Sequence, residues 1–158
     1  MTKTNRIIYF IISLACFITF NLFLTSSILN SMPQLSSNPI FSLLYVKNTG
    51  AAFSIFEGAR MFLIIFAILA LTSVIFYTIK NITKYSLITV FCSAMLCAGI
   101  FCNMCERIIL GYVRDFIKLN FIDFPVFNIS DIYINISVFV IVFIVIKNTY
   151  FRKHETDN

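Results

Sequence analysis

Four long apolar stretches set the limits on how this chain can fold. They run from about Ile7 to Ile28, Arg60 to Ile79, Ser86 to Cys105 and Ile129 to Ile146. A helix rises ~1.5 Å per residue and the hydrocarbon layer of a membrane is ~30 Å thick, so each stretch is long enough to cross it. Because backbone groups in lipid must satisfy one another locally, we predict that all four stretches are helices.

The overall composition agrees with a membrane location. Of the 158 residues, 59% are hydrophobic, whereas a soluble domain has about 45–50% apolar residues. The first stretch is longer than the apolar core of a signal peptide and no small-residue cleavage site follows it, so we expect it to remain in the protein. The sequence therefore predicts an all-α membrane protein with four transmembrane helices, in one domain covering residues 1–158.

The basic residues predict the orientation of the helices. They gather in both terminal tails and in the short link between the second and third stretches: Lys3, Arg6, Lys80, Lys84, Lys147, Arg152 and Lys153. With two acids of the C-terminal tail, they account for the net charge of +5. Cytoplasmic loops are rich in Lys and Arg, so both termini are expected to face the cytoplasm. No basic stripe with interleaved aromatic residues occurs, and nucleic-acid binding is not expected.

Two long connections are then expected outside the membrane. The first, from about Leu29 to Ala59, contains two prolines and a run from Leu43 to Phe56 that does not follow a helical period. We interpret it as short strands with a small amphipathic piece resting on the membrane. The second connection, from about Glu106 to Asn128, carries most of the charge on that side.

Two aspartates beside the apolar stretches are candidates for chemistry. Asp115 lies in the second outer connection, and Asp131 lies at the start of the fourth stretch. An Asp at a helix centre in the membrane costs roughly 2.5–3.5 kcal/mol, so ionisable groups near such segments are often functional. Two carboxyl groups held close together share a proton, and one can activate water while the other protonates the substrate. The alternative is that both are anchors in water at the membrane surface.

The start of the fourth helix suggests which carboxyl group is charged. Asn128 or Ser130 is a plausible N-cap, and the positive end of the helix dipole would favour the ionised form of Asp131. Asp115 is then expected to hold the shared proton.

Four short blocks, in order along the chain, resemble the signatures of bacterial lipoprotein signal peptidases (signal peptidase II). They are NTGAAFS at residues 48–54, GIFCNMCER at 99–107, GYVRDFI at 111–117 and FPVFNISD at 124–131. Their order, their spacing and the four-helix layout also resemble this family, so the similarity extends over nearly the whole chain.

The resemblance implies an aspartyl endopeptidase of the bacterial inner membrane. It would remove signal peptides from diacylglyceryl-modified prolipoproteins, cutting before the lipidated cysteine. The implied partners are these substrates and membrane lipid, with no metal or other cofactor, and we expect a monomer. Asp115 and Asp131 take the catalytic positions. Residues that shape the site or bind substrate are Asn48, Gly50, Asn103, Arg107 and Asn128, and the segment after Asn48 would form part of a small extracytoplasmic β-sheet cradle.

Simpler roles remain open for several of these residues. The asparagines could serve only to bond backbone groups between helices, and Gly50 could be a turn glycine. The chain also departs from the family pattern at Asn21 and Thr25 (usually an acid and a lysine), Cys102 (Gly), Glu106 (Asp), Ser130 (Ala) and Ser137 (Gly). These departures leave open a weaker activity or a changed substrate range.

Two other functions compete with the peptidase. Cys102 and Cys105 form a C-x-x-C pair, as in a quinone-linked membrane disulfide oxidase. That mechanism needs a second cysteine pair, which the second outer connection lacks. The other candidate is a non-catalytic membrane scaffold, in which both aspartates could be neutralised without consequence. A zinc site is disfavoured because the only histidine, His154, lies in the opposite tail.

Overall fold

The computed structural model describes residues 1–31, 38–50 and 56–156, with side chains to residue 149. Within these ranges it has four helices and two strands: α1 (Lys3–Ser31), β1 (Phe41–Asn48), α2 (Arg60–Lys80), α3 (Leu87–Ile109), β2 (Val113–Leu119) and α4 (Ile129–Thr156). All four described helices are long and apolar enough to cross a membrane. The predicted four-helix membrane fold is therefore confirmed.

The central helix of the bundle is α3, which packs against α1, α2 and α4. Its most apolar stretch is 61% buried, compared with 17% to 22% in the other three helices. Gly99 allows α4 to approach closely, since a Cβ atom at this position would lie 2.6 Å from the backbone oxygen of Ser130. The first turns of α4 are thus held directly against α3.

Helix α3 is longer than we predicted. The third apolar stretch was expected to end near Cys105, but the helix continues to Ile109 and therefore includes Glu106 and Arg107. No strong helix breaker occurs before Gly111, which adopts a φ of +88°. The extra turn carries both charged side chains towards the two strands.

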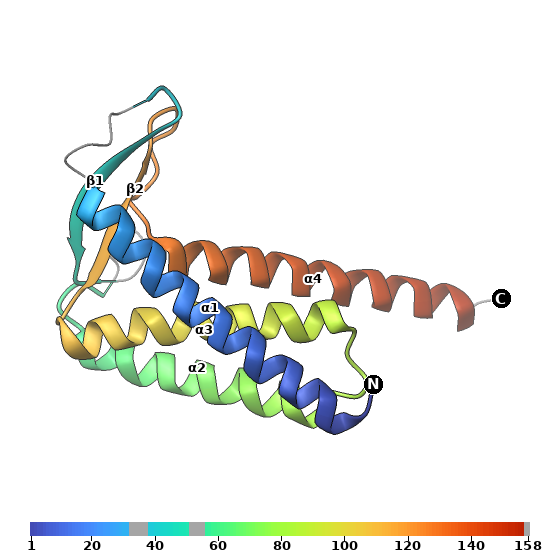
Figure 1. The fold of residues 1–158 in the computed structure, drawn as a ribbon. Helices are drawn as coiled ribbons and strands as arrows, with labels where there is room; N and C mark the ends of the chain where they lie inside the picture. The colour runs from blue at the N-terminus through green and yellow to red at the C-terminus, as the bar shows by residue number, and fades with distance from the viewer. Residues whose placement is uncertain (32–37, 51–55, 157–158) are drawn as a thin grey trace.

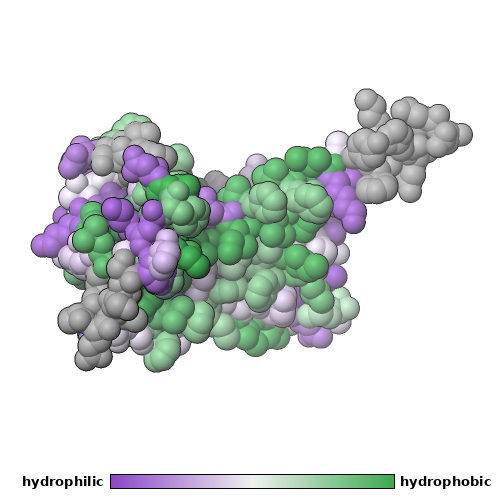
Figure 2. All heavy atoms as spheres, turned by 90° about the horizontal axis from the view of Figure 1, so that it is seen from above, coloured by the Kyte–Doolittle hydropathy of each residue, from purple (hydrophilic) through white to green (hydrophobic). Residues whose placement is uncertain are grey.

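The two ends of the bundle differ in character (Figure 1). The N-terminus, the α2–α3 link and the end of α4 lie at one end, while the two strands cover the other. Arg6 joins the N-terminal part of α1 to the α2–α3 link, because its Nη1 donates to the backbone oxygens of Ile82 and Tyr85 at 3.0 and 2.6 Å. The outer surface of the helices is apolar, and polar residues gather over the strand end (Figure 2). Phe23, Phe139 and Phe143 are 64%, 74% and 60% exposed, as expected for side chains that face lipid.

The strands come from the two different long connections and pair antiparallel. Val46 lies opposite Asp115, and Asn48 lies opposite Val113. We expected the segment after Asn48 to form part of the sheet; β1 ends at Asn48, and residues 51–55 of that segment lie outside the described residues. The Asn48 Oδ1 atom accepts the backbone N–H of Gly50 at 2.9 Å, a local turn that ends the strand. The prediction of strand structure in the first connection is confirmed by β1; the predicted amphipathic piece was given no bounds, and residues 32–37 and 51–55 of this connection lie outside the described residues.

Candidate active site

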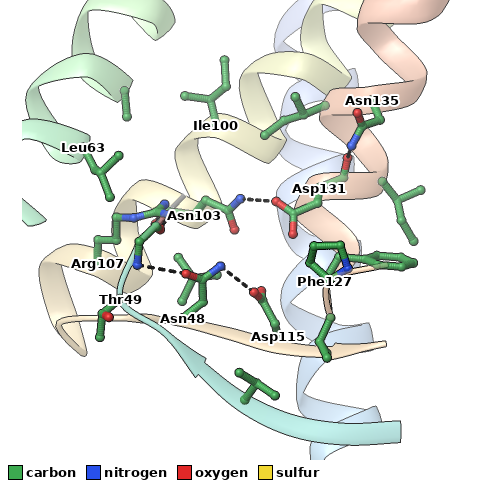
Figure 3. Close-up of a pocket in the computed structure, with 18 of the residues that line it drawn as sticks. Asn48, Thr49, Leu63, Ile100, Asn103, Arg107, Asp115, Phe127, Asp131 and Asn135 are labelled. Atoms are coloured by element: carbon green, nitrogen blue, oxygen red, sulfur yellow. Dashed lines mark hydrogen bonds between the residues drawn. The ribbon is translucent and has the colours of Figure 1, made fainter. Parts of the chain in front are cut away.

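The two candidate acids lie where β2 meets the first turn of α4. Asp115 lies in β2 and is only 1% exposed, while Asp131 is half-buried. Figure 3 shows both carboxyl groups pointing into the space between these two elements. Because Asp115 is buried, it does not serve as an anchor in water, which was the simplest alternative for this residue.

Three asparagine side chains hold the two acids. Asn48 Nδ2 donates to Asp115 Oδ2 at 2.8 Å, and Asn103 Nδ2 donates to Asp131 Oδ1 at 2.8 Å (Figure 3). Asn128 Nδ2 donates to Asp115 Oδ1 at 2.7 Å and to Asn103 Oδ1 at 3.2 Å. Carboxylates accept hydrogen bonds at both oxygens, and amide groups suit them because they donate without adding charge. These asparagines therefore do more than bond the helix backbone.

Asn128 also fixes the beginning of α4. Its Oδ1 atom accepts the backbone N–H of Asp131 at 3.1 Å, while Asp131 Oδ2 accepts the backbone N–H of Asn128 at 3.1 Å. This reciprocal pair is a capping box. The N-cap is thus Asn128, while the Ser130 hydroxyl accepts a hydrogen bond from Asn21 Nδ2 at 3.0 Å. Asn128 therefore contacts both candidate acids at once.

Arg107 joins the third helix to the end of β1. Its Nη2 donates to the backbone oxygen of Gly50 at 2.8 Å, and its Nη1 donates to the backbone oxygen of Asn103 at 3.3 Å. The structure thus brings together all seven residues singled out in the sequence. They come from four elements and from the turns that follow β1 and precede α4.

A cavity of about 1270 Å³ opens beside these residues. Six of the seven predicted site residues line it, all but Asn128. The cavity continues between apolar side chains of α2 and α4, among them Leu63, Phe66, Ala70, Val74, Ile132 and Val138. One end of the cavity is therefore polar and carries the two acids, while the rest suits an apolar ligand.

Burial changes the acidity of Asp115. The loss of hydration raises its pKa from 3.8 to about 6. Hydrogen bonds from Asn48 and Asn128 and the charge of Arg107 oppose this rise, and the charge of Asp131 adds to it. A carboxyl group with a pKa near 6 can hold a proton under mildly acidic to neutral conditions and still release it.

Several departures from the family pattern make specific contacts. Asn21 and Ser130 form a buried hydrogen bond between α1 and α4, and Glu106 forms an ion pair with Arg114. Thr25 is buried, and Ser137 is fully buried. Arg114 was not predicted as a site residue, because nothing local distinguishes it from other basic residues of the second connection. The one signal in the sequence that could have pointed to Arg114 is that a basic residue just beyond the Gly111 turn can pair with Glu106.

The cysteines are free thiols. Cys102 is buried and Cys105 is half-buried, and neither is in a disulfide. Among the described residues, no three His, Cys, Asp or Glu side chains gather closely enough to hold a metal ion.

Fold and site together define a class of protein. It is a multi-pass membrane protein that holds a pair of carboxyl groups at the polar end of a largely apolar cavity. A family model described as Signal peptidase (SPase) II matches residues 11–147. This chain therefore belongs to the signal peptidase II family and is a peptidase, as its sequence blocks suggested.

Individual relatives agree with this assignment. A lipoprotein signal peptidase of Streptococcus thermophilus is 39% identical over 108 residues, which is 68% of this chain and 70% of the relative. One from Caldicellulosiruptor bescii is 40% identical over 111 residues, 68% and 69% of the two chains. A bacterial membrane enzyme solved by the in meso method superposes with a TM-score of 0.77 at 28% identity, covering 89% of this chain and 88% of that one. None of these matches supports a disulfide oxidase.

Proposed function

We propose that this chain is an aspartyl endopeptidase that removes signal peptides from diacylglyceryl-modified prolipoproteins, cutting before the lipidated cysteine. The observation that carries the proposal is the pair of carboxyl groups, Asp115 and Asp131, bridged by Asn128 at the polar end of an apolar cavity. Relatives with the name lipoprotein signal peptidase support the choice of substrate.

Hydrolysis needs one charged and one protonated carboxyl group. Asp131 lies in the first turn of α4 and accepts hydrogen bonds from Asn103 Nδ2 and from the backbone N–H of Asn128, which stabilise its charged form, so we assign it the role of base. It takes a proton from a water molecule as the water oxygen attacks the scissile carbonyl carbon. Asp115, whose pKa is raised to about 6, gives its proton to the carbonyl oxygen. When the C–N bond breaks, the leaving nitrogen takes the proton from Asp131 and the carbonyl oxygen returns one to Asp115.

The cavity suits a substrate that is polar at the cleavage site and apolar elsewhere. Its apolar part runs between α2 and α4, where a signal helix or acyl chains would meet side chains such as Phe66, Ala70 and Val138. Asn48, Asn103 and Arg107 line the polar part and are placed to contact substrate as well as to hold the site. Asn128 does not line the cavity, so we assign it to positioning the two acids.

The charge pattern and the fold together favour one orientation in the bacterial inner membrane. The basic tails and the basic α2–α3 link lie at the bundle end opposite the strands (Figure 1). We therefore place both termini in the cytoplasm and the sheet outside. A reporter fused after residue 158 should be cytoplasmic, and one inserted near Ser36, outside the described residues, should be external. Reporters on the same side would contradict this topology.

The catalytic assignment can be tested in cells that rely on this enzyme alone. Asp115→Asn and Asp131→Asn keep the size of each side chain but remove its acid–base chemistry. Each variant should accumulate uncut, lipidated precursor while the protein reaches parental levels in the membrane. The matched control is Asp123→Asn, which changes an exposed acid of the same outer connection and should process precursor normally. Normal processing by either catalytic variant would rule out the aspartyl mechanism.

A further inference from the structure

An ion pair outside the cavity holds β2 to the end of α3. The Glu106 Oε1 atom accepts from Arg114 Nη2 at 2.6 Å and from Arg114 Nε at 2.9 Å. The other oxygen, Oε2, accepts the backbone N–H of Arg114 at 2.7 Å. One carboxylate thus fixes both the side chain and the backbone of a single residue, a charge-assisted arrangement that is stronger and more directional than a simple surface pair.

This ion pair lies next to the candidate acid in the chain. Arg114 precedes Asp115, and successive side chains of a strand point to opposite faces. Fixing the backbone of Arg114 therefore fixes where β2 presents the Asp115 carboxyl group. On the other face, that group receives the hydrogen bonds of Asn48 and Asn128.

Two consecutive residues of α3 hold the two strands separately. Glu106 binds β2 through Arg114, and Arg107 binds the turn after β1 through the backbone oxygen of Gly50. Both residues lie in the last turns of α3, which also carries Asn103, the partner of Asp131. The rigid central helix is thus a common reference for both carboxyl groups.

We infer that Glu106 is a positioning residue for Asp115, acting through Arg114. The inference rests on the proposed function, since it concerns the placement of one of the two acids. Glu106 suits this role because its carboxylate uses both oxygens to reach the backbone and the guanidinium group together. Neither Glu106 nor Arg114 lines the cavity, so their effect falls on the chemical step and leaves substrate binding unchanged.

The test is steady-state cleavage of a synthetic lipidated prolipopeptide by purified protein in detergent or lipid. Glu106→Ala removes all three hydrogen bonds, and a displacement of about 1 Å at a reacting group costs roughly a hundredfold in rate. We expect kcat to fall roughly ten- to hundredfold with KM within about twofold of the parent. Glu106→Gln keeps an oxygen for the backbone N–H of Arg114, so it should retain more activity than Glu106→Ala.

A double variant tests the path through Arg114. If Glu106 acts through this residue, Arg114→Ala should add little to the loss caused by Glu106→Ala. If the losses of the two single variants multiplied in the double variant, Glu106 and Arg114 would act independently and the inference would be overturned. A parental kcat in folded Glu106→Ala, or a change in KM alone, would also overturn it. If Glu106→Ala does not fold, kcat and KM of Glu106→Gln are compared with those of the parent in the same way.

Two controls separate this inference from the proposed function. Asp123→Ala removes an exposed acid of the same connection and should leave both kinetic constants unchanged. Asp115→Asn reports on the mechanism itself. If Asp115→Asn is inactive and Glu106→Ala cleaves normally, only the positioning inference fails, whereas an active Asp115→Asn variant removes the proposed function as well.

Discussion

The helical bundle and the strand end of this molecule are held together by different forces. The bundle packs through apolar and small side chains, with a cluster around Phe10 and a close helix contact at Gly99. At the strand end, Phe116 of β2 packs into an apolar cluster with α3 and α4, and polar contacts such as Asn48–Asp115 and Glu106–Arg114 then fix the position of the two described strands. Substitutions in the bundle should therefore change how much protein folds. Substitutions at the strand end should change how well each folded molecule works.

The largest effect after loss of the acids themselves is expected for Asn128→Ala. The change removes the N-cap of α4, at about 1 kcal/mol, together with the hydrogen bond to Asp115. Because both acids lose a partner, we expect activity per folded molecule to fall roughly a hundredfold. Cleavage rates normalised to folded protein measure this.

A cap at the other end of the bundle provides the matched control for Asn128. Asn81 follows α2, and its Nδ2 donates to the backbone oxygen of Tyr77 at 3.0 Å. Asn81→Ala should lower stability slightly and leave the cleavage rate unchanged. Equal losses of activity in the two variants would remove the distinction between the two regions.

A moderate effect on stability, with the cleavage rate per folded molecule unchanged, is expected for Phe10→Leu in the bundle. Phe10 is 3% exposed and packs in the cluster with Val90 and Ala94. A smaller side chain there should lower the free energy of unfolding by roughly 1 kcal/mol and reduce the yield. The rate per folded molecule should stay near that of the parent. Phe23→Leu, at a lipid-facing position of the same helix, should change neither quantity.

A smaller effect concerns the pH dependence of stability. Burial raises the pKa of Asp115 to about 6, above its ordinary value of 3.8, so the folded state binds the proton more tightly than the unfolded chain. This contribution to stability is fully present below pH 4 and is lost as the pH rises through about 6. Asp115→Asn cannot lose a proton, so its melting temperature relative to the parent should rise from pH 4 to pH 8. A constant difference over that range would show that Asp115 titrates normally.

The smallest effect is expected for the cysteines. Replacing Cys102 and Cys105 together by Ala removes two free thiols near the site but no acid or amide group. A carboxylate mechanism needs no thiol, so prolipoprotein cleavage should stay within about twofold of the parent. Loss of cleavage in a folded double variant would revive the disulfide-exchange hypothesis.

The sequence predicted the bundle well because a transmembrane helix is a local property. Twenty apolar residues identify a span without reference to any other part of the chain. The observed helix ends differ from the predicted ones mainly where no helix breaker occurs, as at Glu106 and Arg107. The sheet was predicted less well. Strand β2 pairs with β1 from a distant connection, and no local pattern in either strand specifies that pairing.

The candidate site shows the same limit. Asp115 and Asp131 were candidates because of their position beside apolar stretches, and the other five residues were found through resemblance to a family. The contacts among all seven needed the structure. Asn21 and Ser130 are 109 positions apart, yet they form a buried hydrogen bond beside Asp131. Each residue on its own looked like a departure from the family pattern, and only the fold shows that the two occupy neighbouring positions.

The proposed mechanism requires that Asp115 and Asp131 act as one unit. The most direct test is the cleavage rate of a lipidated prolipoprotein by four purified proteins: the parent, Asp115→Asn, Asp131→Asn and the double variant. Each single change should lower the rate roughly a thousandfold or more, and the double change should cost little beyond either one. Losses that multiply in the double variant, or a single variant that cleaves at close to the parental rate, would contradict the claim.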